Sequence, residues 1–380
     1  RRMTADAQNR SVQSLSVIAQ RFAIPGEFMS ALSYGSGHIN DTYRVVFRSP
    51  SGGEEQFILQ RINTHVFHAP QALMENIARV TAHLAAKVAG QPDSHRQVLT
   101  LVPTREGQPV STDEEGGLWR CYRFVEDTCS YDIVDTPERA RAAAFAFGRF
   151  QSLLADLPAP RLHDTIPGFH DTPARLRAFE QALAADSAGR ASSAQPEIDF
   201  LLARRTLAHR LIDASLPERI THNDAKINNV LFDNTNGEGA CIGICVIDLD
   251  TVMPGLALYD FGDMVRTMTS SAAEDETDLS LVEMRFVYFQ AIARGYLAGA
   301  GGALTLAEKR LLIAAGQVIT YEQALRFLSD HLAGDPYYKI HRPNHNLDRC
   351  RTQIRLLSSI ESQEAEMHAF LQELLREPSL

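Results

Sequence analysis

The segment from His222 to Asn229 combines residue types and a spacing that can carry out chemistry. Asp224 stands near its start, Asn229 follows five residues later, and the apolar run 244–247 further on ends in Asp248. In phosphoryl transfer an aspartate orients the acceptor hydroxyl and takes its proton, while an asparagine and a second aspartate hold magnesium. An Asn- and Asp-rich turn is the plainer alternative, but the placement of Asp248 disfavours it. The pattern therefore predicts phosphoryl transfer from a nucleotide to a hydroxyl, with Asp224 as general base.

Three residues in and near this segment are predicted to support the base. Lys226 lies two residues after Asp224 and can reach the transferring phosphate, where it would offset developing charge. We expect His222 to brace the loop by hydrogen bonds rather than to take part in the chemistry. Asp260 opens a string that spells the metal-binding tripeptide of protein kinases, but it comes 31 residues after Asn229. We therefore interpret Asp260 as another brace and not as a metal ligand.

The predicted metal ligands are Asn229, Asp248 and Asp250. Magnesium binds few protein carboxylates and keeps waters and substrate phosphates as its other ligands. Asp248 and Asp250 would point to opposite sides of a strand end unless the chain bends there. We assign Asp248 as the chief ligand beside Asn229, and Asp250 as a lesser candidate.

A glycine-rich turn, Gly35-Ser36-Gly37, is a candidate for nucleotide binding. It lies between two predicted strands, and its glycines let the backbone approach phosphates closely. A hairpin turn with no functional role would have the same composition. Val125, at the end of the predicted strand 118–125, is a further cofactor-binding candidate.

Arg61 is the remaining cofactor-binding candidate. It shares one face of the third predicted strand with Phe57 and Leu59, where a kinase keeps the cation that pairs with nucleotide phosphates. An arginine at a solvent-exposed sheet edge is the alternative. Glu75, the only acidic residue of the following helix, would be its partner, although it falls opposite that helix's apolar stripe.

Turn residues and apolar periodicity predict a change of architecture near Glu126. Before it we expect a small antiparallel sheet carrying one helix, and after it mainly helices, beginning with an Ala-rich helix over 140–157. Two short strands joined by a turn at 233–237 flank the catalytic segment. The predicted strands are 31–34, 42–47, 56–62, 98–102 and 118–125, with helices over 11–24 and from Pro70. This is an α+β, two-lobe fold: an N-terminal nucleotide-binding lobe over 1–126 and a C-terminal catalytic and substrate-binding lobe over 127–380.

The composition is typical of a globular protein without a nucleic-acid or membrane partner. A net charge of −10 and a pI of about 5.7 disfavour binding to nucleic-acid backbones. No apolar run reaches the roughly 18 residues of a membrane-spanning helix. The start at Arg1-Arg2 lacks the apolar core of a secretory signal, so we expect a cytoplasmic protein. The five cysteines show no paired metal spacing and are expected to be reduced and buried: Cys121, Cys129, Cys241, Cys245 and Cys350.

The chain resembles the aminoglycoside phosphotransferase / choline kinase superfamily of small-molecule kinases, and within it the N-acetylhexosamine 1-kinases most. The matching strings extend from about residue 35 to 353. They are Gly37–Tyr43, Leu59–Asn63, His222–Asn229, Val246–Gly255, Tyr259–Asp263, Arg326–Leu328 with Gly334-Asp335, and His345–Leu347.

This resemblance implies a protein-kinase-like fold and phosphorylation of an anomeric hydroxyl by ATP with Mg²⁺. It also implies that Arg326 and Tyr337 contact the sugar and that His38 lies near the acceptor pocket. From the residues alone, a surface helix end followed by the turn 334–336 is the favoured interpretation of Arg326 and Tyr337.

The leading hypothesis is therefore an ATP-dependent kinase of a hexosamine or hexose. The runner-up keeps the chemistry but changes the acceptor to an aminoglycoside, choline, ethanolamine or homoserine. A cationic acceptor needs an acidic pocket; Asp330 and Asp335 are available, but so are Arg326, Lys339, Arg342, Arg349 and Arg351, which favours a sugar. A non-catalytic nucleotide-binding protein is the third hypothesis, and the complete set of catalytic residues argues against it. The oligomeric state cannot be predicted from these patterns.

Overall fold

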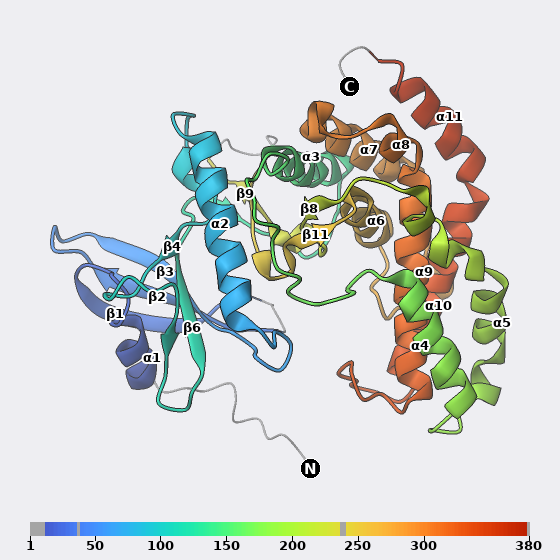
Figure 1. Cartoon of the computed structure of the whole chain (residues 1–380), viewed down its shortest axis with the longest axis horizontal. Helices are drawn as coiled ribbons and strands as arrows, with labels where there is room; N and C mark the ends of the chain where they lie inside the picture. The colour runs from blue at the N-terminus through green and yellow to red at the C-terminus, as the bar shows by residue number, and fades with distance from the viewer. Residues whose placement is uncertain (1–11, 36–38, 236–240, 378–380) are drawn as a thin grey trace. The chain divides into compact units, whose positions relative to one another are not determined.

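The chain folds into two compact units, which divide between Asp127 and Thr128. The computed structural model describes residues 12–35, 39–235 and 241–377, and Figure 1 shows their helices and strands. Within those residues no helix is both long and apolar enough to cross a membrane. All five cysteines are free, and Cys129 and Cys241 are only partly buried.

The first unit is built on a six-stranded antiparallel sheet. Its strands run in the order β1-β2-β3-β6-β4, and β5 also pairs with β6. The predicted strand 98–102 contracts to two residues, because only Leu101 and Val102 pair with β6. The strands are β1 Glu27–Ser33, β2 Asp41–Arg48, β3 Glu54–Arg61, β4 Leu101–Val102, β5 Ser111–Thr112 and β6 Leu118–Arg123.

Alternation along β3 gives the sheet two distinct faces. Phe57 and Leu59 are buried in a core that includes Leu15 and Ile18 of helix α1 (Val12–Ala19). Gln60 points to the other face, where it accepts a hydrogen bond from Arg120 (3.0 Å). Arg120 also contacts Met74 of helix α2 (Pro70–Val88), so α2 packs on that second face.

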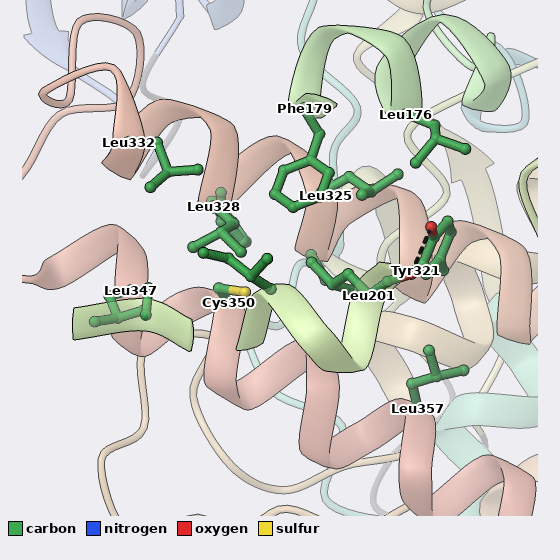
Figure 2. Packing of buried hydrophobic residues seen from close by; sticks show 14 of the residues in the cluster. Leu176, Phe179, Leu201, Tyr321, Leu325, Leu328, Leu332, Leu347, Cys350 and Leu357 are labelled. Atoms are coloured by element: carbon green, nitrogen blue, oxygen red, sulfur yellow. Dashed lines mark hydrogen bonds between the residues drawn. The ribbon is translucent and has the colours of Figure 1, made fainter. Parts of the chain in front are cut away.

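The second unit is mainly helical and is organised around α9, a 21-residue helix that is buried along most of its length. Figure 2 shows α9 packed against α4, α5 and α10 through Phe179, Leu201, Leu325 and Leu328, among others. The helices are α3 Pro137–Leu153, α4 Thr172–Ala185, α5 Gln195–Ala203, α6 Ala257–Met268, α7 Phe286–Ala300, α8 Leu306–Arg310, α9 Leu312–Leu332, α10 His345–Ser362 and α11 Glu364–Leu374.

Helices α3 and α7 approach each other closely because glycines line their contact. A Cβ atom on Gly148 would lie 2.3 Å from the carbonyl oxygen of Tyr296. A Cβ on Gly299 would lie 2.2 Å from the carbonyl oxygen of Phe145. Real Cβ atoms do not approach backbone so closely, so only glycine fits these positions. Helix α3 of this pair also packs against β10.

Two small antiparallel sheets in the second unit hold the catalytic segment. Strand β8 (Arg219–Thr221) pairs with β11 (Met253–Gly255). Strand β9 (Val230–Asp233) pairs with β10 (Gly243–Val246) and, on its other side, with β7 (Thr128–Cys129). The segment 222–229 connects β8 to β9, and Asp248 follows β10. The last two residues of the predicted turn 233–237 lie outside the described residues.

Candidate active site

The catalytic segment is fixed first by Asp260, which lies in the first turn of α6 and is fully buried. Its two carboxylate oxygens accept hydrogen bonds from the backbone N–H groups of His222 (2.9 Å) and Asn223 (2.7 Å). Burial raises the pKa of Asp260, while the hydrogen bonds from the two backbone N–H groups favour the ionised form. The predicted role of Asp260 as a brace for the loop is confirmed.

His222 holds the segment against the end of β10. Its Nε2 donates to the carbonyl oxygen of Ile247 (2.9 Å), and its Nδ1 accepts from the backbone N–H of Asp224 (3.3 Å). The carbonyl accepts and the amide donates, so the ring is neutral with its proton on Nε2. Phe147 and Phe150 pack edge-on against the imidazole. The prediction that His222 braces the loop by hydrogen bonds is confirmed.

Asn223 adopts a left-handed backbone conformation, with φ of 63°. Such a conformation is tolerated by asparagine and kept in place by surrounding bonds. The Asn223 amide nitrogen donates to the carbonyl oxygen of Thr251 (2.9 Å), and its oxygen accepts from the hydroxyl of Thr221 (2.9 Å). The turn at Asn223 thus sets the direction in which the chain enters Asp224.

The carboxylate of Asp224 lies between Lys226 and Asn229. Lys226 Nζ is 2.9 Å from Asp224 Oδ2, and the Asn229 amide donates to the same oxygen (3.1 Å) and to the Asp224 carbonyl (2.8 Å). Burial alone would raise the pKa of Asp224, but the charge and hydrogen bond of Lys226, with the hydrogen bond of Asn229, outweigh it and hold that pKa below its usual range. Asp224 is therefore ionised at neutral pH and able to accept a proton.

Asn229 and Asp248 offer oxygen ligands to a hard divalent cation. The side-chain nitrogen of Asn229 is used by Asp224, which leaves its oxygen for another partner. The N–H of Ile247 donates to the Asn229 carbonyl (2.9 Å), which ties the segments that carry Asn229 and Asp248 together. Asp248 has a φ of 60° and a solvent-exposed side chain, whereas Asp250 is 2% exposed. Exposure makes Asp248 the better placed of the two carboxylates.

The electrostatics around Asp248 also suit a cation. Burial by the surrounding protein and then the carboxylates of Asp250 and Asp224 raise the pKa of Asp248 to about 6. Its side chain is open to solvent, so the neighbouring carboxylates account for more of this shift than burial does. Within the described ranges, no three acidic, histidine or cysteine side chains form a closed metal cage. The two oxygen ligands offered by Asn229 and Asp248 suit a hard cation such as magnesium, which takes substrate phosphates and waters as its other ligands.

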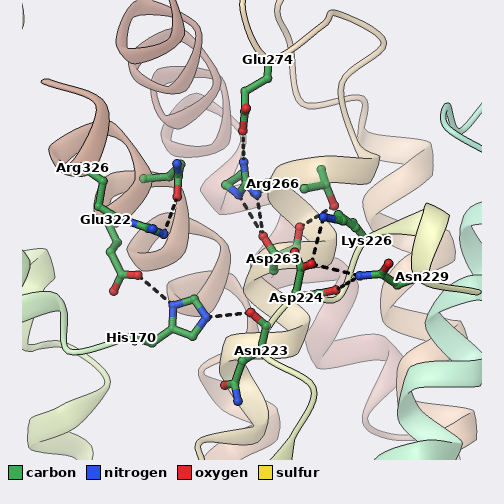
Figure 3. A network of polar contacts seen from close by, with 12 residues as sticks. His170, Asn223, Asp224, Lys226, Asn229, Asp263, Arg266, Glu274, Glu322 and Arg326 are labelled. Carbon is green, nitrogen blue, oxygen red and sulfur yellow. Dashed lines mark hydrogen bonds and ion pairs between the residues drawn. The ribbon is translucent and has the colours of Figure 1, made fainter. Parts of the chain in front are cut away.

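Sequence patterns did not reveal a second group of charges close to Lys226, shown in Figure 3. Arg266 is 2.9 Å from Asp263, one turn before it on α6, and 2.8 Å from Glu274. Burial would lower the pKa of Lys226, but Asp224 above all, with Asp248 and Asp263, raises it overall. Arg266 and Glu274 belong to no recognised motif, so only their three-dimensional placement brings them to the site.

The proposed substrate residue Arg326 lies on α9, among aromatic rings. Its guanidinium donates to Gln323 (3.1 Å) and stands 5.6 Å from the centre of the Phe169 ring and 5.7 Å from that of Tyr338. Tyr337 is 68% exposed, so its ring is open to a ligand. His38, the third proposed substrate residue, lies outside the described residues.

Asp330 fixes the turn that presents Tyr337. Its carboxylate accepts hydrogen bonds from the backbone N–H groups of Tyr337 and Tyr338, both at 2.9 Å, and from the Asn346 side chain at 2.9 Å. Asp335 pairs with Arg190 at 2.6 Å. Both carboxylates that were considered for an acidic pocket are therefore occupied by other groups of the protein.

The nucleotide-binding candidates lie in the first unit. Gly35 has a φ of 81°, and a Cβ there would meet no atom within 4 Å, so its backbone is open to a ligand. Ser36 and Gly37 lie outside the described residues. Val125 is buried just beyond β6.

The structure places Arg61 beside acidic residues other than the expected one. Arg61 is 3.8 Å from Asp113 and 3.8 Å from Glu115, near the β5–β6 turn. The suggested pairing with Glu75 is wrong, because Arg61 continues the β3 face that meets α1, while Glu75 belongs to α2 on the opposite face. Arg120 is a cation that does contact α2, and the sequence patterns did not single it out.

Fold and site together define a kinase-like phosphotransferase, and comparison with known proteins agrees. A family model described as the phosphotransferase enzyme family matches residues 30–298, more than half of the chain. The chain belongs to this family. It is an ATP-dependent phosphotransferase that uses a hydroxyl group of a small molecule as acceptor, as the sequence predicted.

Solved structures with the same fold cover almost all of the chain. A microcompartment-associated aminopropanol kinase is 17% identical, with a TM-score of 0.57 over 95% of this chain and 100% of the other. An aminoglycoside phosphotransferase from Alicyclobacillus acidocaldarius is 14% identical, with a TM-score of 0.58 over 99% of each. An amicoumacin kinase solved with AMP-PNP and Ca²⁺ is 13% identical, with a TM-score of 0.58 over 94% and 95%. These likenesses confirm the predicted α+β, kinase-like fold.

Proposed function

We propose that this protein transfers the γ-phosphoryl group of ATP, with Mg²⁺, to the anomeric hydroxyl of a hexosamine or hexose. The proposal assigns nucleotide binding to residues 1–126, and catalysis and substrate binding to 127–380. The single observation that favours a sugar over an amine is the charge of the acceptor residues around Arg326. The catalytic half of the proposal rests on Asp224 and its neighbours.

Asp224 acts as the general base in this proposal. It is ionised at neutral pH, and its hydrogen bonds to Asn229 and Lys226 hold the carboxylate in one orientation. A carboxylate of low pKa is a weak base, so it removes the proton late, when the acceptor oxygen already bonds to phosphorus. An anomeric hydroxyl is more acidic than an ordinary alcohol, which suits such a base. Lys226, 2.9 Å from Asp224, would then balance charge on the transferred group.

Asn229 and Asp248 would hold the metal ion in this scheme. The Asn229 oxygen and the exposed Asp248 carboxylate are the kind of ligand that Mg²⁺ prefers. The ion, when bound, would neutralise the negative charge of the nucleotide phosphates. Asp250 is buried and its backbone carbonyl is held by the Thr165 hydroxyl (2.9 Å), so we give it no direct role.

The acceptor residues support a neutral sugar rather than a cation. Among the described residues, Arg326 has no ion pair or hydrogen bond with a carboxylate, so its positive charge faces the aromatic side chains and any ligand. Asp330 and Asp335 are occupied by backbone N–H groups and by Arg190. An ammonium group would meet a like charge here, whereas a sugar offers oxygen acceptors to a guanidinium and an apolar face to Tyr337.

Replacement of Arg326 by glutamine tests this argument. With N-acetylglucosamine as acceptor, we expect the KM for the sugar to rise about 10-fold or more and the KM for ATP to stay unchanged, because one charge-assisted contact is lost. Arg351→Gln, which removes a guanidinium paired with Glu197 elsewhere in the same unit, is the matched control. ADP release would be measured with N-acetylhexosamines, hexoses, ethanolamine, 1-amino-2-propanol and kanamycin.

Amine acceptors remain the competing proposal, because the aminopropanol kinase and the aminoglycoside phosphotransferase that share this fold are named for amine-bearing substrates. If an amine is the true acceptor, Arg326→Gln should leave its turnover unchanged or improve it, and the sugars should be inert. That result would overturn the sugar assignment and leave the catalytic assignments in place.

A further inference from the structure

A buried ion pair connects the catalytic segment to helix α9. His170 Nδ1 is 2.8 Å from Glu322 Oε1, and His170 Nε2 is 3.2 Å from the backbone carbonyl oxygen of Asn223. The side chains of His170 and Glu322 are 7% and 2% exposed. The two residues are 152 positions apart in the chain, and neither belongs to a sequence motif of the site. Figure 3 shows the continuous path Glu322–His170–Asn223.

The partners of His170 determine its protonation. Nδ1 faces a carboxylate and Nε2 faces a carbonyl, and both groups accept hydrogen bonds. Both ring nitrogens must therefore donate, which requires the charged imidazolium. Burial would lower the pKa of His170, but Glu322 above all, with Asp263 and the Asn223 carbonyl, raises it overall. Glu322 also accepts the Thr172 hydroxyl (2.6 Å), and its own pKa is lowered by His170.

The carbonyl that His170 holds belongs to the peptide bond between Asn223 and the base. Asn223 is the left-handed residue of the loop, and its N–H is held by Asp260. Asp260 fixes the amino side of this residue, and His170 fixes its carbonyl side. A rotation of that peptide would swing the Asp224 carboxylate relative to the acceptor hydroxyl, and displacements of about 1 Å can cost about 100-fold in rate.

Glu322 extends the connection to the acceptor side. It lies one turn before Arg326 on α9, so both side chains project from one face of that helix. The ring of Tyr259 covers His170, with ring centres 4.9 Å apart. We propose that His170 and Glu322 are positioning residues that hold the Asn223 carbonyl, and with it the base Asp224, at a fixed position relative to α9, the helix that carries Arg326. The claim that His170 and Glu322 hold the base requires only the phosphoryl transfer that the family carries out. The claim that they align the base with Arg326 rests on the function proposed above.

Two replacements of His170 separate its two contacts. The amide nitrogen of a glutamine can take the place of Nε2, so His170→Gln keeps a donor for the Asn223 carbonyl and loses Glu322. The amide nitrogen of an asparagine can take the place of Nδ1, so His170→Asn keeps Glu322 and loses the carbonyl. Glu322→Gln removes the negative charge that keeps the ring doubly protonated. Glu197→Gln is the control, since Glu197 is also a largely buried acid paired to an arginine, Arg351, at 2.6 Å.

We expect kcat to fall about 10- to 100-fold in His170→Asn and Glu322→Gln, and less than about 5-fold in His170→Gln, with the KM for ATP unchanged throughout. ADP release should be measured both with N-acetylglucosamine and without acceptor, where water is phosphorylated, so that a wrong acceptor does not mask the result. The proposal is overturned if kcat follows the unfolding temperature across all four variants, Glu197→Gln included. It is also overturned if His170→Asn keeps more activity than His170→Gln. Should Glu322→Gln fail to fold, the order of the two His170 variants still decides.

Discussion

Replacing Asp260 by asparagine should damage both the stability of the protein and its catalysis. Asp260 is fully buried and uses one carboxylate oxygen for each of two backbone N–H groups, those of His222 and Asn223. An asparagine offers only one oxygen. Its amide nitrogen would face a second N–H group, which would leave a buried donor without an acceptor.

The size of the effect follows from these bonds. A hydrogen bond to a charged group contributes about 1.5–3 kcal/mol, and a buried unsatisfied donor costs about 1–3 kcal/mol. The negative charge in the first turn of α6 adds a favourable interaction with the helix dipole, about 0.5 kcal/mol. Against these losses, asparagine removes a buried charge, which is unfavourable enough to raise the pKa of Asp260. We expect a net loss of about 2–4 kcal/mol, or roughly 4–15 °C in Tm.

Thermal unfolding and steady-state kinetics should be measured together on Asp260→Asn. Because the lost bond orients the residue before the base, kcat should fall about 10- to 100-fold, with little change in the KM for ATP. Glu138→Gln is the control: it also removes a carboxylate from the first turn of a helix, α3, but from an exposed position. A variant with a Tm within about 1 °C and a kcat within about 2-fold of the wild type would refute the reasoning.

Three further outcomes are expected. Asp224→Asn should bind ATP with unchanged Kd, measured by calorimetry, but lose turnover by orders of magnitude, because the base is removed while the metal ligands stay; unchanged turnover would remove Asp224 from its assigned role. The stabilisation from His170 should be complete below its ordinary pKa of 6.5 and be lost as the pH rises through its raised folded pKa, while that from Glu322 should be lost as the pH falls below about 4.5. The unfolding free energies of His170→Asn and wild type, measured with denaturant, should therefore converge above pH 6.5. A constant difference between them up to pH 9 would contradict the protonation assigned here. Gly148→Ala should cost about 1–3 kcal/mol of unfolding free energy despite the better helix propensity of alanine, because its Cβ would meet the Tyr296 carbonyl; a Tm at or above that of the wild type would show that α3 and α7 can separate freely.

The catalytic segment was predictable because its parts are close in the sequence. Asp224, Asn229 and Asp248 keep a fixed order around two short strands, so their spacing alone indicates a shared site. The bracing roles of His222 and Asp260 were also predicted. His222 belongs to the catalytic segment itself, and Asp260 comes 31 residues after Asn229, outside the expected position of a metal ligand. These predictions depended on residue type and on spacing along the chain.

Other parts of the site depend on packing that local patterns do not encode. His170 and Glu322 meet only because the segment before α4 packs beside α9, and nothing in their own neighbourhoods marks them. Arg61 was placed correctly on its strand face, but which face meets α2 depends on the packing of the helices, and this misdirected its pairing with Glu75. The short strand β7 was missed, because two residues carry no measurable periodicity.

The central claim is that the acceptor is the anomeric hydroxyl of a sugar, and one comparison tests it most directly. ADP release from ATP–Mg should be measured with N-acetylglucosamine and with its 1-O-methyl glycoside, and the product examined by phosphorus NMR. We predict turnover with the free sugar only, and a product whose phosphorus couples to the anomeric proton. Equal turnover with the methyl glycoside, or turnover only with amines such as ethanolamine, would contradict the proposed function.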